Sequence, residues 1–150
     1  MASLLYNTAK KEIADGTIAL LTDAIKVMLV TSAYVPDADD DVVDAAGADA
    51  LAAEIAVTGY TGGWGGAGRK ALASKAIAVD DANDRAEFDA ADLTWTALGA
   101  GATIAAFILI KEGAANDTTS RLIAYFDVSD TATNGGDYTI TVNAEGLLNF

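Results

Sequence analysis

The side chains in this sequence that could do chemistry are chiefly carboxylates. Aspartate and glutamate number 22, whereas histidine and cysteine are absent. Without those two residue types there is no Ser-His-Asp or Cys-His nucleophile, no histidine general base, no disulfide and no thiolate zinc site. A carboxylate pair could hydrolyse glycosides, but among so many acidic residues sequence spacing selects no pair. We therefore expect no catalytic residue, no cofactor and no enzymatic activity.

Three aspartates, Asp37, Asp39 and Asp41, follow the only proline at alternate positions. They match the first three ligand spacings of an EF-hand calcium loop. The sixth position of such a loop would be Val42 rather than glycine, and the twelfth would be Ala48 rather than glutamate. A solvated acidic loop is the favoured interpretation, with weak calcium binding as the alternative, and we expect no dedicated metal site.

Residues 63–68 (GWGGAG) match the pattern G-x-G-x-x-G of dinucleotide-binding proteins. That site needs a strand before the glycines, a helix after them and an acidic residue about 20 positions further on. The segment after Gly68 has no clear helical pattern, and Arg69 stands where a P-loop would have lysine. The glycines therefore indicate an irregular loop rather than a phosphate site.

Two aromatic residues, Tyr60 and Trp64, lie in this glycine-rich region. Aromatic side chains on loops often anchor contacts with partners, although Trp64 could instead fold back over the end of the domain. Trp95, which lies between threonines in a predicted strand, is assigned to the core. The chain begins with an apolar leader, Leu4-Leu5-Tyr6. This leader and the glycine-rich loop together supply the residues that we expect to contact partners: Leu4, Leu5, Tyr6, Tyr60, Trp64 and Arg69.

The leader precedes a short predicted helix at residues 7–14, which Gly16 would end. Two interpretations of the leader are open. It packs on the protein's own core, or residues 1–6 form an N-terminal arm that docks on a neighbouring molecule.

The elements that position these residues are mostly strands. Residues 103–110 and 122–128 are strand-length runs rich in β-branched and aromatic residues, separated by a small polar segment. They predict a central antiparallel pair, and apolar residues on both faces of the first strand require cover on both sides. Further strands are predicted at residues 17–21, 25–32 and 137–142, and residues 90–96 are predicted to form a turn followed by a strand. Residues 71–79 fit either a strand or a helix face; a strand is favoured because the turn-rich residues 80–84 and the segment 85–88 would complete a hairpin. A second short helix is predicted at residues 45–55.

This pattern predicts one mainly β domain spanning residues 1–150. The expected fold is an antiparallel β-sandwich or a partly closed, jelly-roll-like barrel, with one or two short helices in the N-terminal third. A chain of 150 residues is long enough to bury a core without a metal or disulfides.

The charge of the chain excludes two classes of partner. With only nine basic residues and a net charge of −13, we expect no nucleic acid and no anionic membrane to bind. The apolar runs are shorter than the roughly 18 residues that span a bilayer, and the first residues lack the pattern of a secretory signal.

Several segments, taken in order, resemble a widespread group of small phage virion proteins. The first half of the resemblance lies in Tyr6-Asn7-x-Ala9-Lys10, in Gly16-Thr17-Ile18 and in the run from Thr22-Asp23 to Tyr34-x-Pro36. The second half lies in Thr58-Gly59-Tyr60, in residues 88–95 and 122–126, and in the closing Gly146-Leu147-Leu148. The glycine-rich loop and the acidic loop depart from the pattern of the group, the first in length and the second in charge.

The resemblance implies a non-enzymatic structural protein of the virion. The implied role is a capsid decoration, or cement, protein that binds the major capsid protein on the exterior of the head. Closed oligomers are common among soluble proteins, and a homo-oligomer, either a trimer or a dimer, would suit a site on a local symmetry axis of the shell. A tail or baseplate component is the alternative within the virion. A carbohydrate-binding adhesion module that uses Tyr60 and Trp64 is the alternative from another class.

Overall fold

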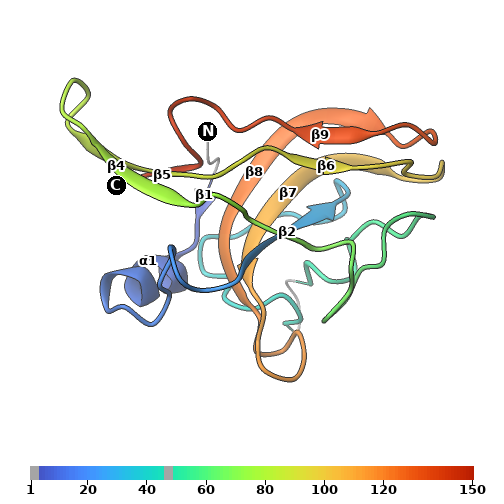
Figure 1. Cartoon of the computed structure of the whole chain (residues 1–150). Coiled ribbons are helices and arrows are strands. Elements are labelled where there is room, and N and C mark those ends of the chain that lie inside the picture. Colours follow the sequence, from blue (N-terminus) through green and yellow to red (C-terminus); the bar gives the residue numbers. More distant parts are fainter. Residues whose placement is uncertain (1–3, 46–48) are drawn as a thin grey trace.

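The structure, a computed structural model, describes residues 4–45 and 49–150. Its largest element is an antiparallel sheet with the strand order β1-β8-β7-β2-β3 (Figure 1). The strands of this sheet are β1 (Leu4–Leu5), β2 (Ile25–Val30), β3 (Lys70–Ala71), β7 (Thr103–Lys111) and β8 (Arg121–Ala132). The predicted central pair is confirmed as β7 and β8, with β7 in the middle of the sheet.

The centre of the sheet is buried because β7 is covered on both faces. Every residue from 104 to 110 is buried, as expected for a strand with apolar side chains on both sides. Phe107 lies directly opposite Phe126 on β8, and their rings stack with centroids 4.4 Å apart. The register of the two strands shifts twice, between Ile104 and Ala106 and between Leu109 and Ile110.

Two smaller antiparallel sheets complete the fold. One has the order β10-β5-β4 and the other pairs β6 with β9. Their strands are β4 (Ala76–Asp80), β5 (Arg85–Asp89), β6 (Leu93–Trp95), β9 (Tyr138–Ile140) and β10 (Leu148–Asn149). In Figure 1 the chain from β5 to β6 runs across β8 and β7. Phe88, Trp95 and Ile140 join Phe107 in one hydrophobic core. The described residues thus form a β-sandwich with no closed barrel.

One short helix, α1 (Asn7–Ala14), contacts β8. It ends where Gly16 takes a φ of +80°, a left-handed conformation that glycine adopts without a steric penalty. Tyr6 occupies the N-cap position and makes no side-chain capping bond. In residues 4–45 and 49–150, no helix is long and apolar enough to cross a bilayer.

Two predicted elements are wrong. Residues 17–21 form bends and a turn rather than a strand, and Ile18 and Leu20 are buried although the backbone here is irregular. Of the helix predicted at residues 45–55, residues 46–48 lie outside the described part, and residues 49–55 form turns and a bridge. Ile55 N donates to Leu29 O at 3.0 Å. The edge of β2 therefore supplies the hydrogen bonds that a helix would have made internally.

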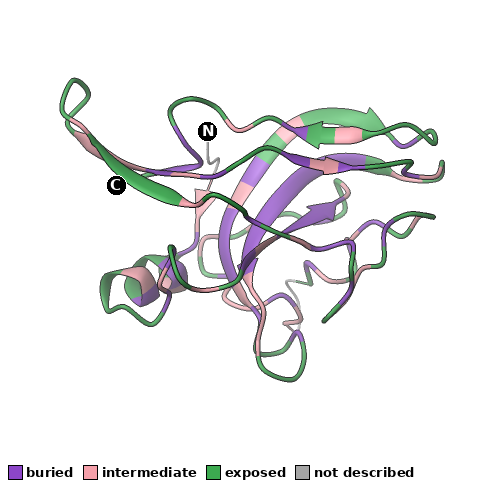
Figure 2. Cartoon of the chain, viewed as in Figure 1, coloured by how far each residue is buried: buried purple, intermediate pink, exposed green. Residues whose placement is uncertain are grey.

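The predicted hairpin at residues 71–88 is confirmed as β4 and β5, with strand β4 shorter than the predicted segment. Its far end extends away from the rest of the protein and is largely exposed (Figure 2). The mainly antiparallel β fold with a single short helix in the described N-terminal third thus follows the prediction.

Candidate contact surface around Trp64

The glycine-rich loop folds tightly on itself. Gly68 N donates to Thr61 O at 2.8 Å, and Gly66 N donates to Gly63 O at 2.9 Å. A Cβ on Gly66 would collide with the carbonyl oxygens of Thr61 and Gly62, so this compact turn requires glycine there. The loop leads into the short strand β3 and not into a helix, which removes the helix N-terminus that a dinucleotide site would need.

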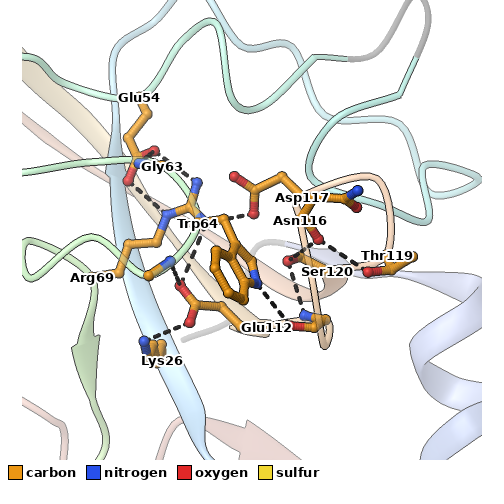
Figure 3. Close-up of polar contacts among 12 residues, drawn as sticks. Lys26, Glu54, Gly63, Trp64, Arg69, Glu112, Asn116, Asp117, Thr119 and Ser120 are labelled. Atoms are coloured by element: carbon orange, nitrogen blue, oxygen red, sulfur yellow. Dashed lines mark hydrogen bonds and ion pairs between the residues drawn. The ribbon is translucent and has the colours of Figure 1, made fainter.

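Arg69, at the end of the loop, lies at the centre of a buried group of charges (Figure 3). Its guanidinium donates to both carboxylate oxygens of Glu54, at 2.9 and 2.8 Å, and to Asp117 Oδ1 at 2.7 Å. Glu112 Oε1 lies 3.7 Å from Arg69 Nη1, and its other oxygen accepts from Lys26 Nζ at 2.6 Å. The group therefore joins the loop to β2, to the segment before the loop and to the segment after β7.

The protonation of this group follows from its contacts. Burial disfavours the charged form of Arg69, but hydrogen bonds from the guanidinium to Glu54 and Asp117 outweigh burial and raise its pKa. Tyr60 donates to Glu54 Oε1 at 2.7 Å and accepts from Leu29 N at 3.1 Å. Burial, and then the nearby Glu54 charge, raise the pKa of the Tyr60 hydroxyl. At neutral pH these groups serve as fixed ionic and hydrogen-bonding contacts within the fold.

Trp64 is held against the segment that follows β7. Its indole Nε1 donates to Gly113 O at 2.8 Å, and Gly65 N donates to Glu112 Oε1 at 3.3 Å. Asn116 and Ser120 shape the same segment, since Ser120 Oγ accepts from Gly113 N at 3.0 Å and donates to Asn116 O at 3.3 Å. Trp64 remains 47% exposed. The arrangement presents a large aromatic side chain to solvent in one fixed position.

Of the predicted contact residues in the loop, only Trp64 is available to a partner. Tyr60 and Arg69 are 5% and 2% exposed, and their expected role as contact residues is corrected to that of internal supports. Both are polar at one end only, so a buried hydrogen bond or ion pair satisfies that end while the rest of the side chain packs. An open hollow beside the loop is lined by Leu51, Glu54, Ile55, Ala56, Tyr60, Thr61, Gly62 and Gly63.

The leader belongs to the protein's own sheet. Leu4 and Leu5 form β1, pair with Tyr125 and Ala124 on β8, and are half-buried. Tyr6 is fully buried, so its predicted role as a partner contact is corrected. This is the first of the two interpretations of the leader, packing on its own core. Residues 1–3 of the predicted arm lie outside the described part of the chain.

Tyr6 also connects the leader to the acidic loop. Its hydroxyl lies 2.8 Å from the Tyr34 hydroxyl, which donates to Asp40 Oδ2 at 2.8 Å. Asp40 also accepts from Asp37 N at 3.0 Å and is buried. The prediction of a solvated acidic loop is therefore wrong at Asp40, whose carboxylate is an internal hydrogen-bond acceptor.

The other aspartates of this loop do not converge on one point. Asp39 Oδ1 accepts from Asn7 Nδ2 at 2.8 Å, Asp41 Oδ2 lies 3.4 Å from Arg121 Nη1, and Asp37 Oδ1 accepts from Asp39 N at 3.0 Å. In the described part of the chain, no group of three or more carboxylates is placed to hold a metal ion.

Sequence reasoning missed a second exposed apolar surface, on the β4–β5 hairpin. Ile77 and Val79 on β4 are 47% and 74% exposed, and Phe150, on the other side of β5, is 49% exposed. The alternation of Ile77 and Val79 with alanines predicted a strand. It gave no sign that the apolar face of this strand extends past the rest of the core.

Comparisons with known proteins returned no match: no family model, no curated protein and no solved structure corresponds to this chain.

Proposed function

We propose that this protein is a non-enzymatic structural component of a bacteriophage virion, which binds the outer surface of the capsid and stabilises the expanded head as a decoration protein. The observation that carries the proposal is the fixed, exposed Trp64. A tryptophan already ordered before binding loses little conformational entropy in a complex, and tryptophans are enriched among the residues that dominate interface energies. The sequence resemblance to small virion proteins supports the same role.

The surroundings of Trp64 favour binding over catalysis. Glu54 and Asp117 are both hydrogen-bonded to Arg69, and Glu112 pairs with Lys26. Carboxylates whose oxygens already bind cations within the fold are poorly placed to reach a substrate, as a general acid or base must. The hollow beside the loop is lined in part by apolar side chains, among them Leu51 and Ile55. The surface is therefore suited to a protein partner, which we propose is the major capsid protein.

Stabilisation of the head would follow from mass action. A ligand that binds the expanded shell, and not its dissociated or precursor forms, stabilises the shell by an amount that grows with its concentration. The net charge of −13 opposes contact with packaged DNA, so the proposed location is the exterior of the capsid.

The decisive experiment adds the purified protein to expanded heads assembled without it, pellets the heads and quantifies the bound protein. Decoration predicts saturation at a fixed ratio to the capsid subunit and a higher melting temperature of the heads. Absence of binding to expanded heads would contradict the proposal.

Copy number in purified virions separates the alternatives. A decoration protein should approach the abundance of the major capsid protein, whereas a tail or baseplate component should be scarce. An adhesion module should instead bind glycans in an array, and should lose that binding in Trp64→Ala.

A further inference from the structure

We propose that β4 pairs with β4 of a second copy of this chain, antiparallel and about a two-fold axis at Ala78, so that two β10-β5-β4 sheets join into one continuous sheet. This inference concerns the purified protein alone and does not depend on the proposed role in the virion.

The first observation is that β4 is an open edge. It is the last strand of the sheet β10-β5-β4, and among the described residues only β5 pairs with it. An edge strand presents unpaired backbone N–H and C=O groups, which proteins usually protect with charges, prolines, bulges or covering segments. Residues 76–79, Ala-Ile-Ala-Val, carry no such protection and are exposed.

The second observation is that this edge is apolar on the face that continues the core. Ile77 lies opposite Phe88 on β5, and Phe88 lies opposite Leu148 on β10. In the next row, Val79 lies opposite Ala86, which exchanges two backbone hydrogen bonds with Phe150 at 3.1 and 3.0 Å.

The row formed by Ile77, Phe88 and Leu148 is buried except at Ile77. The row formed by Val79, Ala86 and Phe150 is exposed at Val79 and Phe150. The same sheet face thus passes from covered to uncovered along the hairpin. A second copy on the free edge would extend this apolar face and cover part of it.

The third observation is that the sequence of the edge is complementary to itself. With an axis at Ala78, Ile77 faces Val79 of the second copy, and Ala78 faces Ala78. Continuing the register just beyond the ends of β4 brings Lys75, whose Nζ also donates to Asp23 O of its own chain, opposite Asp81 of the second copy. Opposite charges therefore lie near both ends of the pairing.

Other registers fit less well. An axis at Ile77 would place Lys75 opposite Val79, and an axis at Val79 would place Ile77 opposite Asp81. If the axis fell between two residues, Ile77 and Val79 of one copy would lie on the opposite face of the joined sheet from Ile77 and Val79 of the other copy, because side chains alternate along a strand. The complementarity of residues 75–81 with themselves is what selects a second copy over a different partner.

Disulfide cross-linking tests this register directly. Because the protein contains no cysteine, a single introduced cysteine can form a disulfide only with the same residue of a second copy. Residues directly opposite in an antiparallel pair have Cα atoms about 4.5–5.5 Å apart, within the range of a disulfide. Under mild oxidation at micromolar concentration, Ala78→Cys should form a covalent dimer on a non-reducing gel.

Ala76→Cys is the matched control for this test. Ala76 is also exposed on the same strand, but in the proposed register it faces Asp80 of the second copy and lies about four residues, roughly 13 Å, from its own counterpart. Ala76→Cys should therefore stay monomeric on the gel. Equal cross-linking of both variants, or none in either, would overturn the proposed pairing.

Sedimentation of the full chain without cysteines provides the second measurement. The unmodified protein should form a dimer at tens of micromolar, and Val79→Lys should weaken dimerisation at least tenfold, because a lysine on each strand would face Ile77 of the other copy. The control is Val35→Lys, which changes a valine that is 80% exposed outside this edge and should leave the dimer intact. A monomer at all concentrations, including the case in which β4 proves instead to bind a capsid strand, would overturn the inference.

Discussion

The guanidinium of Arg69 meets the carboxylate of Glu54 at two points, Nε to Oε1 at 2.9 Å and Nη2 to Oε2 at 2.8 Å, with both side chains almost fully buried. Glu54 bridges to Val30 at the end of β2 and accepts a hydrogen bond from Gly63 N at 2.8 Å. The pair therefore connects the central sheet to the loop that presents Trp64. The rigidity of the proposed contact surface depends on this connection.

Replacement of Arg69 by methionine should destabilise the fold strongly. Methionine fills much of the same space but leaves Glu54 and Asp117 without their cation, and breaking a buried ion pair from one side typically costs about 3–5 kcal/mol. Urea denaturation should show a loss in the free energy of unfolding of that order. The control is Lys11→Met, which breaks an exposed pair with Asp15 on α1 and should leave the midpoint unchanged. A similar midpoint for both variants would contradict the structural role of Arg69.

Alkaline pH should destabilise the protein through its buried tyrosines. Burial is the main cause that raises the pKa of Tyr6, Tyr34 and Tyr60 above the ordinary value. These hydroxyls stay protonated in the fold while the unfolded chain loses its protons near pH 10. Their contribution is complete below pH 10 and falls as the pH rises, by about 1.4 kcal/mol per pH unit for each tyrosine.

Urea denaturation at several pH values between 9 and 11.5 tests this dependence, with Tyr34→Phe as the comparison. The variant should show a shallower pH dependence than the unmodified protein, because one of the retained protons is missing. Tyrosinate absorbance of the folded protein gives an independent reading. Titration of all five tyrosines near pH 10 without unfolding would contradict the burial of these hydroxyls.

Replacement of Trp64 by alanine should separate binding from folding. The indole is exposed and makes one hydrogen bond, to Gly113, so stability should change by less than about 1 kcal/mol. Binding to expanded heads should weaken roughly 30-fold or more, the effect of losing a contact worth at least 2 kcal/mol. Co-sedimentation with heads measures this, and Val35→Ala provides an exposed apolar control. Equal affinity of the two variants would remove Trp64 from the contact surface.

Alanine at Gly66 should disturb the loop from within. The added Cβ would meet two backbone carbonyl oxygens that cannot move without unfolding the turn, and we expect a loss of about 2 kcal/mol or more. At Gly136, an added Cβ meets only the side-chain oxygen of Asn134, at 3.0 Å, so Gly136→Ala should change stability by about 0.5 kcal/mol or less. Thermal unfolding of both variants measures the difference. A Gly66 variant as stable as the Gly136 variant would show that the loop does not need its compact form.

The sequence by itself determined the elements whose residues carry a strong local pattern. The runs of β-branched and aromatic residues at β2, β7 and β8, and the turn residues between β4 and β5, specify strands and hairpins without reference to distant contacts. The absence of histidine and cysteine is likewise a property of composition alone. Residues 17–21 and 49–55 were misassigned because their hydrogen-bond partners are distant or irregular, and local propensity does not contain that information.

Only the tertiary structure decided which side chains are available to a partner. Tyr60 and Trp64 lie in the same glycine-rich segment, yet Tyr60 is buried on Glu54 and Trp64 is exposed. Arg69 lies 48 residues from Asp117 in the sequence and donates to it at 2.7 Å. Ile77 and Val79 look like core residues in sequence, but their hairpin extends past the layer that would cover them. Exposure depends on what packs over a residue, and that is fixed by contacts between segments far apart in the chain.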